Sequence, residues 1–389
     1  MDKQSGKVAV DVDLESRGRL KEFAVVAIAI IAVIYYYASS AKDGDESGEE
    51  LWLLWTIVWL ATRLFQLVAF LAFLLLLVLV FSQRRILYVP VPPGAQREPS
   101  QQMHPDRYDI PYLDVKIKTE DNVEINGWLL YQQRPVQVPF TVLYFHGNAG
   151  NIGHRMENLK HMYERLKFNI LIIDYRGYGC SEDGSGPCQD GFLKDAKASY
   201  RWIVHRIQHP EADEIVSMSL DRILFFGRSI GGAVALKLGA ELLRERLSDE
   251  KQKKSPLQPL PVGFILENTF TNLREMAIQV FGFLRFLRPL LRYPLVLDEW
   301  KGDEALKFIG DNSKHWCLCL LSGRSDQLVP PQQMDALHDI ARARSPQVLR
   351  FEMFPDGGHN DTPTRGGEPY WRAMKSFMEA VKQSEKDRT

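Results

Sequence analysis

A serine between glycines stands where a predicted strand gives way to a predicted helix. The sequence Gly227-Arg228-Ser229-Ile230-Gly231 follows the apolar run Ile223–Phe226. A sharp turn of this kind strains its central residue, and glycines two positions before and after it keep side chains from colliding. The hydroxyl is then held beside the first N–H groups of a helix, which can stabilise an anionic oxygen. The pattern predicts Ser229 as an acyl-transfer nucleophile, with an ordinary Gly-flanked loop serine as the alternative.

A serine nucleophile needs a base to take its proton and a carboxylate to hold that base in its productive tautomer. Asp326 follows the predicted strand Trp316–Leu321, and His359 follows the predicted strand Val348–Phe354. Loops at the carboxyl ends of parallel strands meet at one edge of a sheet. We therefore predict Ser229, Asp326 and His359 as a catalytic triad. Asp356 is the rival acid, but as a turn residue ahead of two glycines it has a sufficient structural reason.

Two backbone N–H groups are predicted to stabilise the oxyanion that forms when a serine attacks a carbonyl group. The first belongs to Ile230, directly after the serine. The second should come from the turn His146–Asn151, which follows the predicted strand Thr141–Phe145. We choose Asn148 for this role, with the neighbouring Ala149 as the alternative. Losing one such donor typically raises the reaction barrier by about 3 kcal/mol.

No cofactor and no metal ion are predicted. The four cysteines have neither zinc-site nor C-x-x-C spacing. Gly147, Gly150 and Gly153 follow a predicted strand and precede Asp174, which imitates a dinucleotide-binding unit. Their spacing, however, is G-x-x-G-x-x-G instead of G-x-G-x-x-G, so we expect no dinucleotide there.

The elements around these residues alternate between strands and helices. Strands are predicted at Leu113–Lys118, Val123–Tyr131, Thr141–Phe145, Ile170–Asp174, Ile223–Phe226, Gly263–Glu267, Trp316–Leu321 and Val348–Phe354. Helices are predicted near Ile152–Leu166, Gly191–Arg206, Gly232–Leu247, Gln332–Ile340 and Tyr370–Val381, and Ser248–Pro256 is predicted as a solvated loop. This alternation indicates an α/β fold: a mostly parallel eight-stranded sheet with an antiparallel edge, flanked by helices, in a domain spanning 110–389.

An apolar region precedes this domain. Leu64–Phe81 has Gln66 as its only polar residue and would be about 27 Å long as a helix, which predicts a transmembrane helix. Leu51–Thr62 is also apolar, with tryptophans spaced for one helical face, and is predicted to lie at the membrane interface or to extend the same helix. The membrane region is thus 51–81, and the proline-rich stretch 82–109 is predicted as a linker.

A second apolar run, Phe23–Ala38, follows an N-terminal tail at 1–22 and is predicted as a second span or a signal-anchor segment. Two spans would form a hairpin with the basic residues of 1–22 and of Arg84-Arg85 on one side, placing the domain in the cytosol. One span would give a type II protein with the domain lumenal or extracellular. Both topologies describe an integral membrane protein.

The composition of the chain indicates which classes of partner the protein binds. The formal net charge of the chain is −1, which argues against a nucleic-acid partner. Charged residues make up 25% of the chain, as in an ordinary soluble domain, and the long apolar runs lie in the first hundred residues. We therefore expect a lipid bilayer as one partner.

The domain from about Ile110 to Val381 resembles the α/β-hydrolase superfamily, and within it the membrane-anchored Bem-type group of α/β-hydrolase domain-containing proteins. The residues that carry the resemblance are His146–Arg155, Asp174–Gly179, Gly227–Gly232, Glu267–Phe270, Ser322–Pro331 and Phe354–Thr362. Cys180 and the insertion Asp183–Pro187 depart from the usual loop after Asp174–Gly179, and Phe23–Ala38 looks additional. The resemblance implies a serine hydrolase whose triad matches Ser229, Asp326 and His359, and by similarity a protein depalmitoylase.

We accordingly expect a membrane-anchored serine hydrolase that forms an acyl-enzyme on Ser229 and acts as an acyl-protein thioesterase (palmitoyl-protein hydrolase) on S-acylated protein. The alternatives are a carboxylesterase for lipid or small-molecule esters, and a non-catalytic membrane scaffold that keeps the fold. Met276–Leu297, rich in phenylalanine and leucine, is predicted as a cap that lines an acyl-chain groove. A helix packed on the sheet is the alternative for this segment.

Overall fold

The computed structural model describes residues 47–386, apart from 134–136, 211–215, 255, 256, 258, 281 and 283–295. The predicted tail at 1–22, the apolar run Phe23–Ala38 and most of the predicted cap lie outside these residues. The described part of the chain divides after Leu79 into two compact units, and the second unit begins at Val80.

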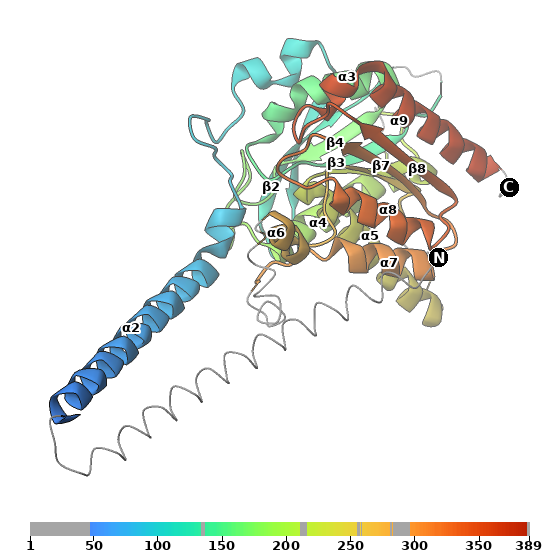
Figure 1. The fold of residues 1–389 in the computed structure, drawn as a ribbon. Coiled ribbons are helices and arrows are strands. Elements are labelled where there is room, and N and C mark those ends of the chain that lie inside the picture. Colours follow the sequence, from blue (N-terminus) through green and yellow to red (C-terminus); the bar gives the residue numbers. More distant parts are fainter. Residues whose placement is uncertain are drawn as a thin grey trace. The chain divides into compact units, whose positions relative to one another are not determined.

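Within the described residues, the apolar region 51–81 is helical without a break. Helix α2 runs from Ser47 to Leu87, a length of 41 residues (Figure 1). Its segment Trp52–Leu87 is long and apolar enough to cross a membrane, and the side chains of that segment are not buried. Leu51–Thr62 and Leu64–Phe81 are therefore parts of one helix. At about 1.5 Å per residue α2 is roughly 60 Å long, twice the thickness of a bilayer core.

The second unit contains an eight-stranded sheet among its described residues, in the order β1-β2-β4-β3-β5-β6-β7-β8. The strands are β1 Tyr112–Lys118, β2 Glu124–Leu130, β3 Thr141–Phe145, β4 Asn169–Ile173, β5 Ile223–Arg228, β6 Gly263–Glu267, β7 Cys317–Gly323 and β8 Val348–Phe354. β2 pairs antiparallel with both β1 and β4, and all pairs from β4 to β8 are parallel. The predicted fold class is confirmed.

Helices cover both faces of the sheet (Figure 1). Their bounds are α3 Met156–Leu166, α4 Gln189–Gln208, α5 Ile230–Lys251, α6 Leu273–Val280, α7 Gly302–Asn312, α8 Gln332–Arg342 and α9 Thr362–Lys386, with 3-10 turns η1 Gln101–Met103, η2 Pro105–Tyr108, η3 Ile152–Arg155 and η4 Leu220–Arg222. One hydrophobic cluster joins the sheet to α3 and α9, and the other joins it to α4, α5, α7 and α8.

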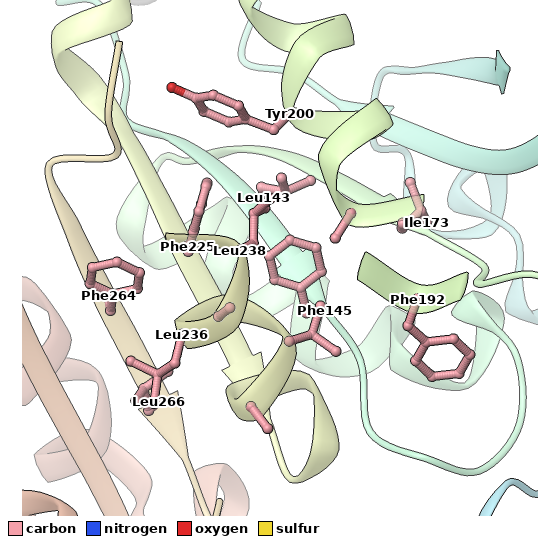
Figure 2. Packing of buried hydrophobic residues seen from close by; sticks show 14 of the residues in the cluster. Leu143, Phe145, Ile173, Phe192, Tyr200, Phe225, Leu236, Leu238, Phe264 and Leu266 are labelled. Atoms are coloured by element: carbon pink, nitrogen blue, oxygen red, sulfur yellow. The ribbon is translucent and has the colours of Figure 1, made fainter. Parts of the chain in front are cut away.

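The central strands are buried on both sides, which explains their continuous apolar sequences. Every residue of β3 and of β5 is buried, and consecutive side chains point to opposite faces. Phe145 and Phe225 therefore belong to the cluster that α5 covers with Leu236, as Figure 2 shows. Tyr144 and Phe226 belong to the cluster on the other face, where their rings stack at 4.6 Å.

Two predicted helices have different bounds in the structure, and helix α7 was not predicted. α5 continues to Lys251, so the first residues of the predicted loop Ser248–Pro256 are helical. An ion pair between Arg246 and Glu250, four residues apart, supports this polar helix end. α9 starts at Thr362, before the predicted start at Tyr370, because two helical pieces join across a kink at Gly367, where φ is 50° and ψ is −138°.

Candidate active site

Ser229 joins β5 to α5 in a strained conformation. Its φ is 54° and its ψ is −126°, a region that residues with side chains rarely adopt. A Cβ atom at Gly227 would lie 2.3 Å from the carbonyl oxygen of Gly231. A Cβ atom at Gly231 would lie 2.0 Å from the carbonyl oxygen of Phe145. Only glycine fits at these two positions, and the turn therefore depends on the spacing found in the sequence.

Asp326 and His359 come together at the ends of β7 and β8. The distance between Asp326 Oδ2 and His359 Nδ1 is 2.8 Å. The other oxygen of Asp326 accepts hydrogen bonds from the N–H groups of Leu328 and Val329, each at 2.8 Å. A carboxylate held in this way favours the tautomer in which Nδ1 carries the proton and Nε2 is the free base. Asp356 is exposed, and no hydrogen bond joins it to His359 in the described part of the chain.

Arg228 connects the serine turn to the histidine loop. Its Nη2 atom donates to the carbonyl oxygen of His359 at 2.6 Å and to Oδ1 of Asn360 at 3.1 Å. Its Nε atom forms an ion pair of 3.1 Å with Glu267, which is fully buried and also accepts a hydrogen bond from the hydroxyl of Tyr370. Arg228 therefore contacts the carboxyl end of β6 and also the loop that follows β8.

Asn268 connects the same loops from the end of β6. Its Nδ2 atom donates to the carbonyl oxygens of Gly358 and His359, at 3.1 and 3.2 Å. Its Oδ1 atom accepts the N–H of Gly323, the last residue of β7, at 2.7 Å. The next residue, Thr269, donates its hydroxyl to the carbonyl oxygen of Ser229 at 2.6 Å.

Sequence reasoning assigned no role to Arg228, Glu267 or Asn268. The available signal was a buried strand, Gly263–Glu267, that ends in an acid followed by asparagine and threonine. Polar residues at the carboxyl end of a buried strand need partners, and here their partners are the loops that carry the predicted triad. The structure thus adds a polar framework to the residues expected from the motifs.

The predicted oxyanion turn lies against the serine. A Cβ atom at Gly147 would be 3.6 Å from Cβ of Ser229. Among the described residues, no hydrogen bond uses the backbone N–H of Ile230 or of Asn148. The side chain of Asn148 is engaged, because its Oδ1 accepts from the Tyr178 hydroxyl at 3.0 Å and its Nδ2 donates to the carbonyl oxygen of Leu87.

His146 begins the same turn but cannot serve as the base. It is fully buried, and burial lowers its pKa to about 3, so the ring is neutral at ordinary pH. Its Nδ1 atom lies 2.7 Å from the carbonyl oxygen of Gly147, which makes Nδ1–H the donor. Its ring packs 4.5 Å from that of Tyr175. These contacts assign His146 to the support of the turn.

No group of three or more histidine, cysteine, aspartate or glutamate side chains is placed to hold a metal ion within the described ranges. The groups gathered at the site are a hydroxyl, an imidazole, a carboxylate and backbone N–H groups. These are the groups that nucleophilic acyl transfer uses.

Comparisons with known proteins point to one family, although no family profile matches the chain. The chain is 36% identical over 309 residues to the alpha/beta hydrolase domain-containing protein WAV2 of Arabidopsis thaliana, covering 77% of this chain and 89% of that protein. It is 30% identical to protein bem46 of Schizosaccharomyces pombe, covering 76% and 85%. The Saccharomyces cerevisiae protein YNL320W, described as an uncharacterized membrane protein, is 29% identical, covering 76% and 88%.

Solved structures share the fold. The Pyrococcus furiosus esterase Pf2001 superposes with a TM-score of 0.52 at 20% identity, covering 75% of this chain and 97% of the esterase. A puromycin-hydrolyzing peptidase of Mycobacterium tuberculosis superposes with a TM-score of 0.51 at 13% identity, covering 71% and 40%. At these identities the likeness concerns the arrangement of strands and helices.

Proposed function

The chain belongs to the family of α/β-hydrolase domain-containing proteins, and from this premise we propose that it is a serine hydrolase with Ser229 as nucleophile, His359 as base and Asp326 as the orienting acid. The observation that carries the proposal is the 2.8 Å contact between Asp326 and His359 at the sheet edge where Ser229 holds its strained turn. The contact of Arg228 with the His359 carbonyl supports it further.

The reaction begins when Ser229 Oγ attacks the carbonyl carbon of a thioester or ester and its proton passes to Nε2 of His359. Asp326 stabilises the imidazolium that forms. The N–H groups of Ile230 and Asn148 donate to the oxyanion of the tetrahedral intermediate. As this intermediate collapses, the bond to the leaving sulfur or oxygen breaks, and His359 returns its proton to the leaving group, which leaves an acyl-Ser229 ester.

Hydrolysis repeats these steps with water. His359 takes a proton from a water molecule, the resulting hydroxide attacks the acyl carbon, and the second tetrahedral intermediate releases the carboxylic acid and the serine. The proton that His359 holds returns to Ser229 Oγ. Atoms and charges then balance: one thioester or ester and one water give one acid and one thiol or alcohol.

The substrate class that we propose is a long-chain acyl thioester on a protein, with α2 as the membrane anchor. Support comes from the end of α2. Phe81, the last residue of the predicted span, precedes Leu87 by about 9 Å of helix, and the carbonyl of Leu87 accepts a hydrogen bond from Asn148. The side chain of the proposed oxyanion donor is therefore hydrogen-bonded to the last residue of the helix that we propose as the anchor.

The experiment combines active-site labelling with product analysis. Full-length protein in detergent should react with a fluorophosphonate probe, and the Ser229→Ala variant should not. The wild-type protein should also release palmitate from an S-palmitoylated peptide faster than it hydrolyses a glyceride. Labelling with preference for the glyceride would instead favour the lipid carboxylesterase. Labelling that persists in Ser229→Ala would overturn the assignment of the nucleophile, and no labelling of the wild type would favour a non-catalytic scaffold.

A further inference from the structure

The end of α2 and the residues after it are packed into the second unit. Tyr88 is 3% exposed, and its hydroxyl donates to Asp298 Oδ2 at 3.0 Å. The same hydroxyl accepts a hydrogen bond of 3.0 Å from the indole N–H of Trp300, which is fully buried. Arg84, one helical turn earlier, forms an ion pair of 3.1 Å with Asp298. Although 82–109 was expected to be a linker, its first residues are thus held at several points.

This held segment, Arg84–Val89, reaches the oxyanion turn. The carbonyl oxygen of Leu87 accepts a hydrogen bond from Nδ2 of Asn148. Two residues later, the carbonyl oxygen of Val89 accepts the N–H of Gly150 at 3.2 Å, and Val89 pairs with Ala149 in an isolated parallel bridge. Three consecutive residues of the turn are therefore bound to two residues of the segment.

The oxyanion turn needs support from other segments because its glycines allow its backbone many conformations. Gly147 and Gly150 flank the proposed donor, and Gly150 has a φ of 74°, which glycine adopts without strain. A backbone N–H that must stabilise a transition state tolerates little displacement, since an error of about 1 Å can lower the rate on the order of 100-fold. The hydrogen bonds to Leu87 and Val89 supply a restraint that the glycines do not.

We propose that Arg84–Val89 is a positioning element of the active site, which holds the oxyanion turn so that the Asn148 N–H points at the reacting carbonyl. The inference deepens the proposed function and rests on it for its catalytic consequence. Asn148 then has two separable roles, because its backbone N–H contacts the substrate while its side chain binds the segment. The carboxyl end of α2 then positions the oxyanion turn in addition to continuing the proposed membrane anchor.

Two variants of the full-length protein in detergent test the proposal. Asn148→Ala keeps the backbone N–H and removes the side-chain hydrogen bonds to Leu87 and Tyr178. Tyr88→Phe removes the hydroxyl that binds Asp298 and Trp300 and leaves every residue of the turn unchanged. Tyr200→Phe is the matched control, because that buried tyrosine on α4 donates its hydroxyl to Pro259, at 2.7 Å, instead of to the turn or the segment.

Two measurements are made on each variant: amide hydrogen exchange of the peptide that contains 146–151, and kcat with KM for a chromogenic ester. In Asn148→Ala and Tyr88→Phe we expect exchange at least about 10-fold faster in this peptide and a kcat about 10-fold to 100-fold lower, with KM within about 3-fold. Tyr200→Phe should change neither quantity in the turn.

Wild-type exchange and wild-type kcat in Asn148→Ala and Tyr88→Phe would overturn the positioning role, as would faster exchange without any change in kcat. If Asn148→Ala fails to fold, the same two measurements on Tyr88→Phe test whether Arg84–Val89 positions the turn. A wild-type protein without turnover or labelling would count against the hydrolase assignment alone, because the exchange rates still show whether the segment holds the turn.

Discussion

The guanidinium of Arg228 donates a 2.6 Å hydrogen bond to the carbonyl oxygen of His359, across 131 positions of the sequence. The residue before the proposed nucleophile thereby holds the backbone of the proposed base. The same guanidinium is paired with the buried Glu267. We expect these contacts to be one physical cause of the alignment of Ser229 with His359 that the proposed reaction requires.

Replacing Arg228 with lysine tests this cause. Arg228→Lys keeps a positive charge beside Glu267, but one ammonium cannot reproduce the planar fork that reaches Glu267, His359 and Asn360. We expect kcat to fall at least about 10-fold and the free energy of unfolding to fall by about 1 to 2 kcal/mol. Ester turnover and urea unfolding measure the two effects. Arg246→Lys, in a half-exposed helical pair, is the control and should leave both unchanged.

The role of Asp326 is tested by an isosteric change. Asp326→Asn keeps the shape of the side chain but favours the wrong tautomer of His359, and we expect kcat to fall by about 10⁴-fold. The rate of fluorophosphonate labelling provides a second measurement of the same loss. Asp356→Asn removes the rival acid and should behave like the wild type. An inactive Asp356→Asn together with an active Asp326→Asn would reverse the assignment.

The strained turn makes Gly231 irreplaceable. A methyl group there would lie 2.0 Å from the carbonyl oxygen of Phe145, so Gly231→Ala must displace α5 from β3. We expect a loss of about 3 kcal/mol or more in the free energy of unfolding. Gly282→Ala adds a methyl group that has no atom of the described residues within 4 Å, and it should change stability by less than about 0.5 kcal/mol. Thermal melting of the two variants makes the comparison.

Asp174 should make stability depend on pH. It is fully buried, and burial raises its pKa to about 7, from about 3.9 in an unfolded chain. Between these values the folded state holds a proton that the unfolded state has released, so the stabilisation present below pH 4 is lost as the pH rises through about 7. The melting temperature of Asp174→Asn minus that of the wild type should therefore be larger at pH 7.5 than at pH 4.5. A constant difference would refute a raised pKa.

A charge in α2 should weaken the proposed anchor. Leu75 lies within the apolar segment and is 60% exposed. Arginine near the centre of a spanning helix costs about 2.5 to 3.5 kcal/mol of insertion free energy. We expect Leu75→Arg to reduce the fraction of protein that resists carbonate extraction from membranes, while Leu75→Phe should not. Equal extraction of both variants would argue against insertion of this segment.

Local patterns in the sequence predicted the turns, strands and helices whose formation depends on residues that are neighbours along the chain. The glycine spacing around Ser229 predicted a strained strand-to-helix turn, because the collision that Gly227 avoids, with the carbonyl oxygen of Gly231, is local. The strands β3 and β6 were predicted with the bounds that the structure has, because buried strands are apolar and end at turn residues. The bounds of β8 were also predicted, although Phe354 is its one buried residue. The run Leu64–Phe81, whose only polar residue is Gln66, predicted a transmembrane helix from its length and composition, and the structure has a helix there whose side chains are not buried.

Only the tertiary structure decided which polar groups meet. Asp326 instead of Asp356 contacts His359, because β7 lies beside β8 and delivers the loop of Asp326 to the histidine. The bonds from Arg228 and Asn268 to the histidine loop arise in the same way at the ends of β5 and β6. The contact of Leu87 with Asn148 joins two segments that share no local pattern. These contacts depend on strand order and packing, which bring together residues that are distant in the sequence. The periodicity of residues along the chain does not predict them.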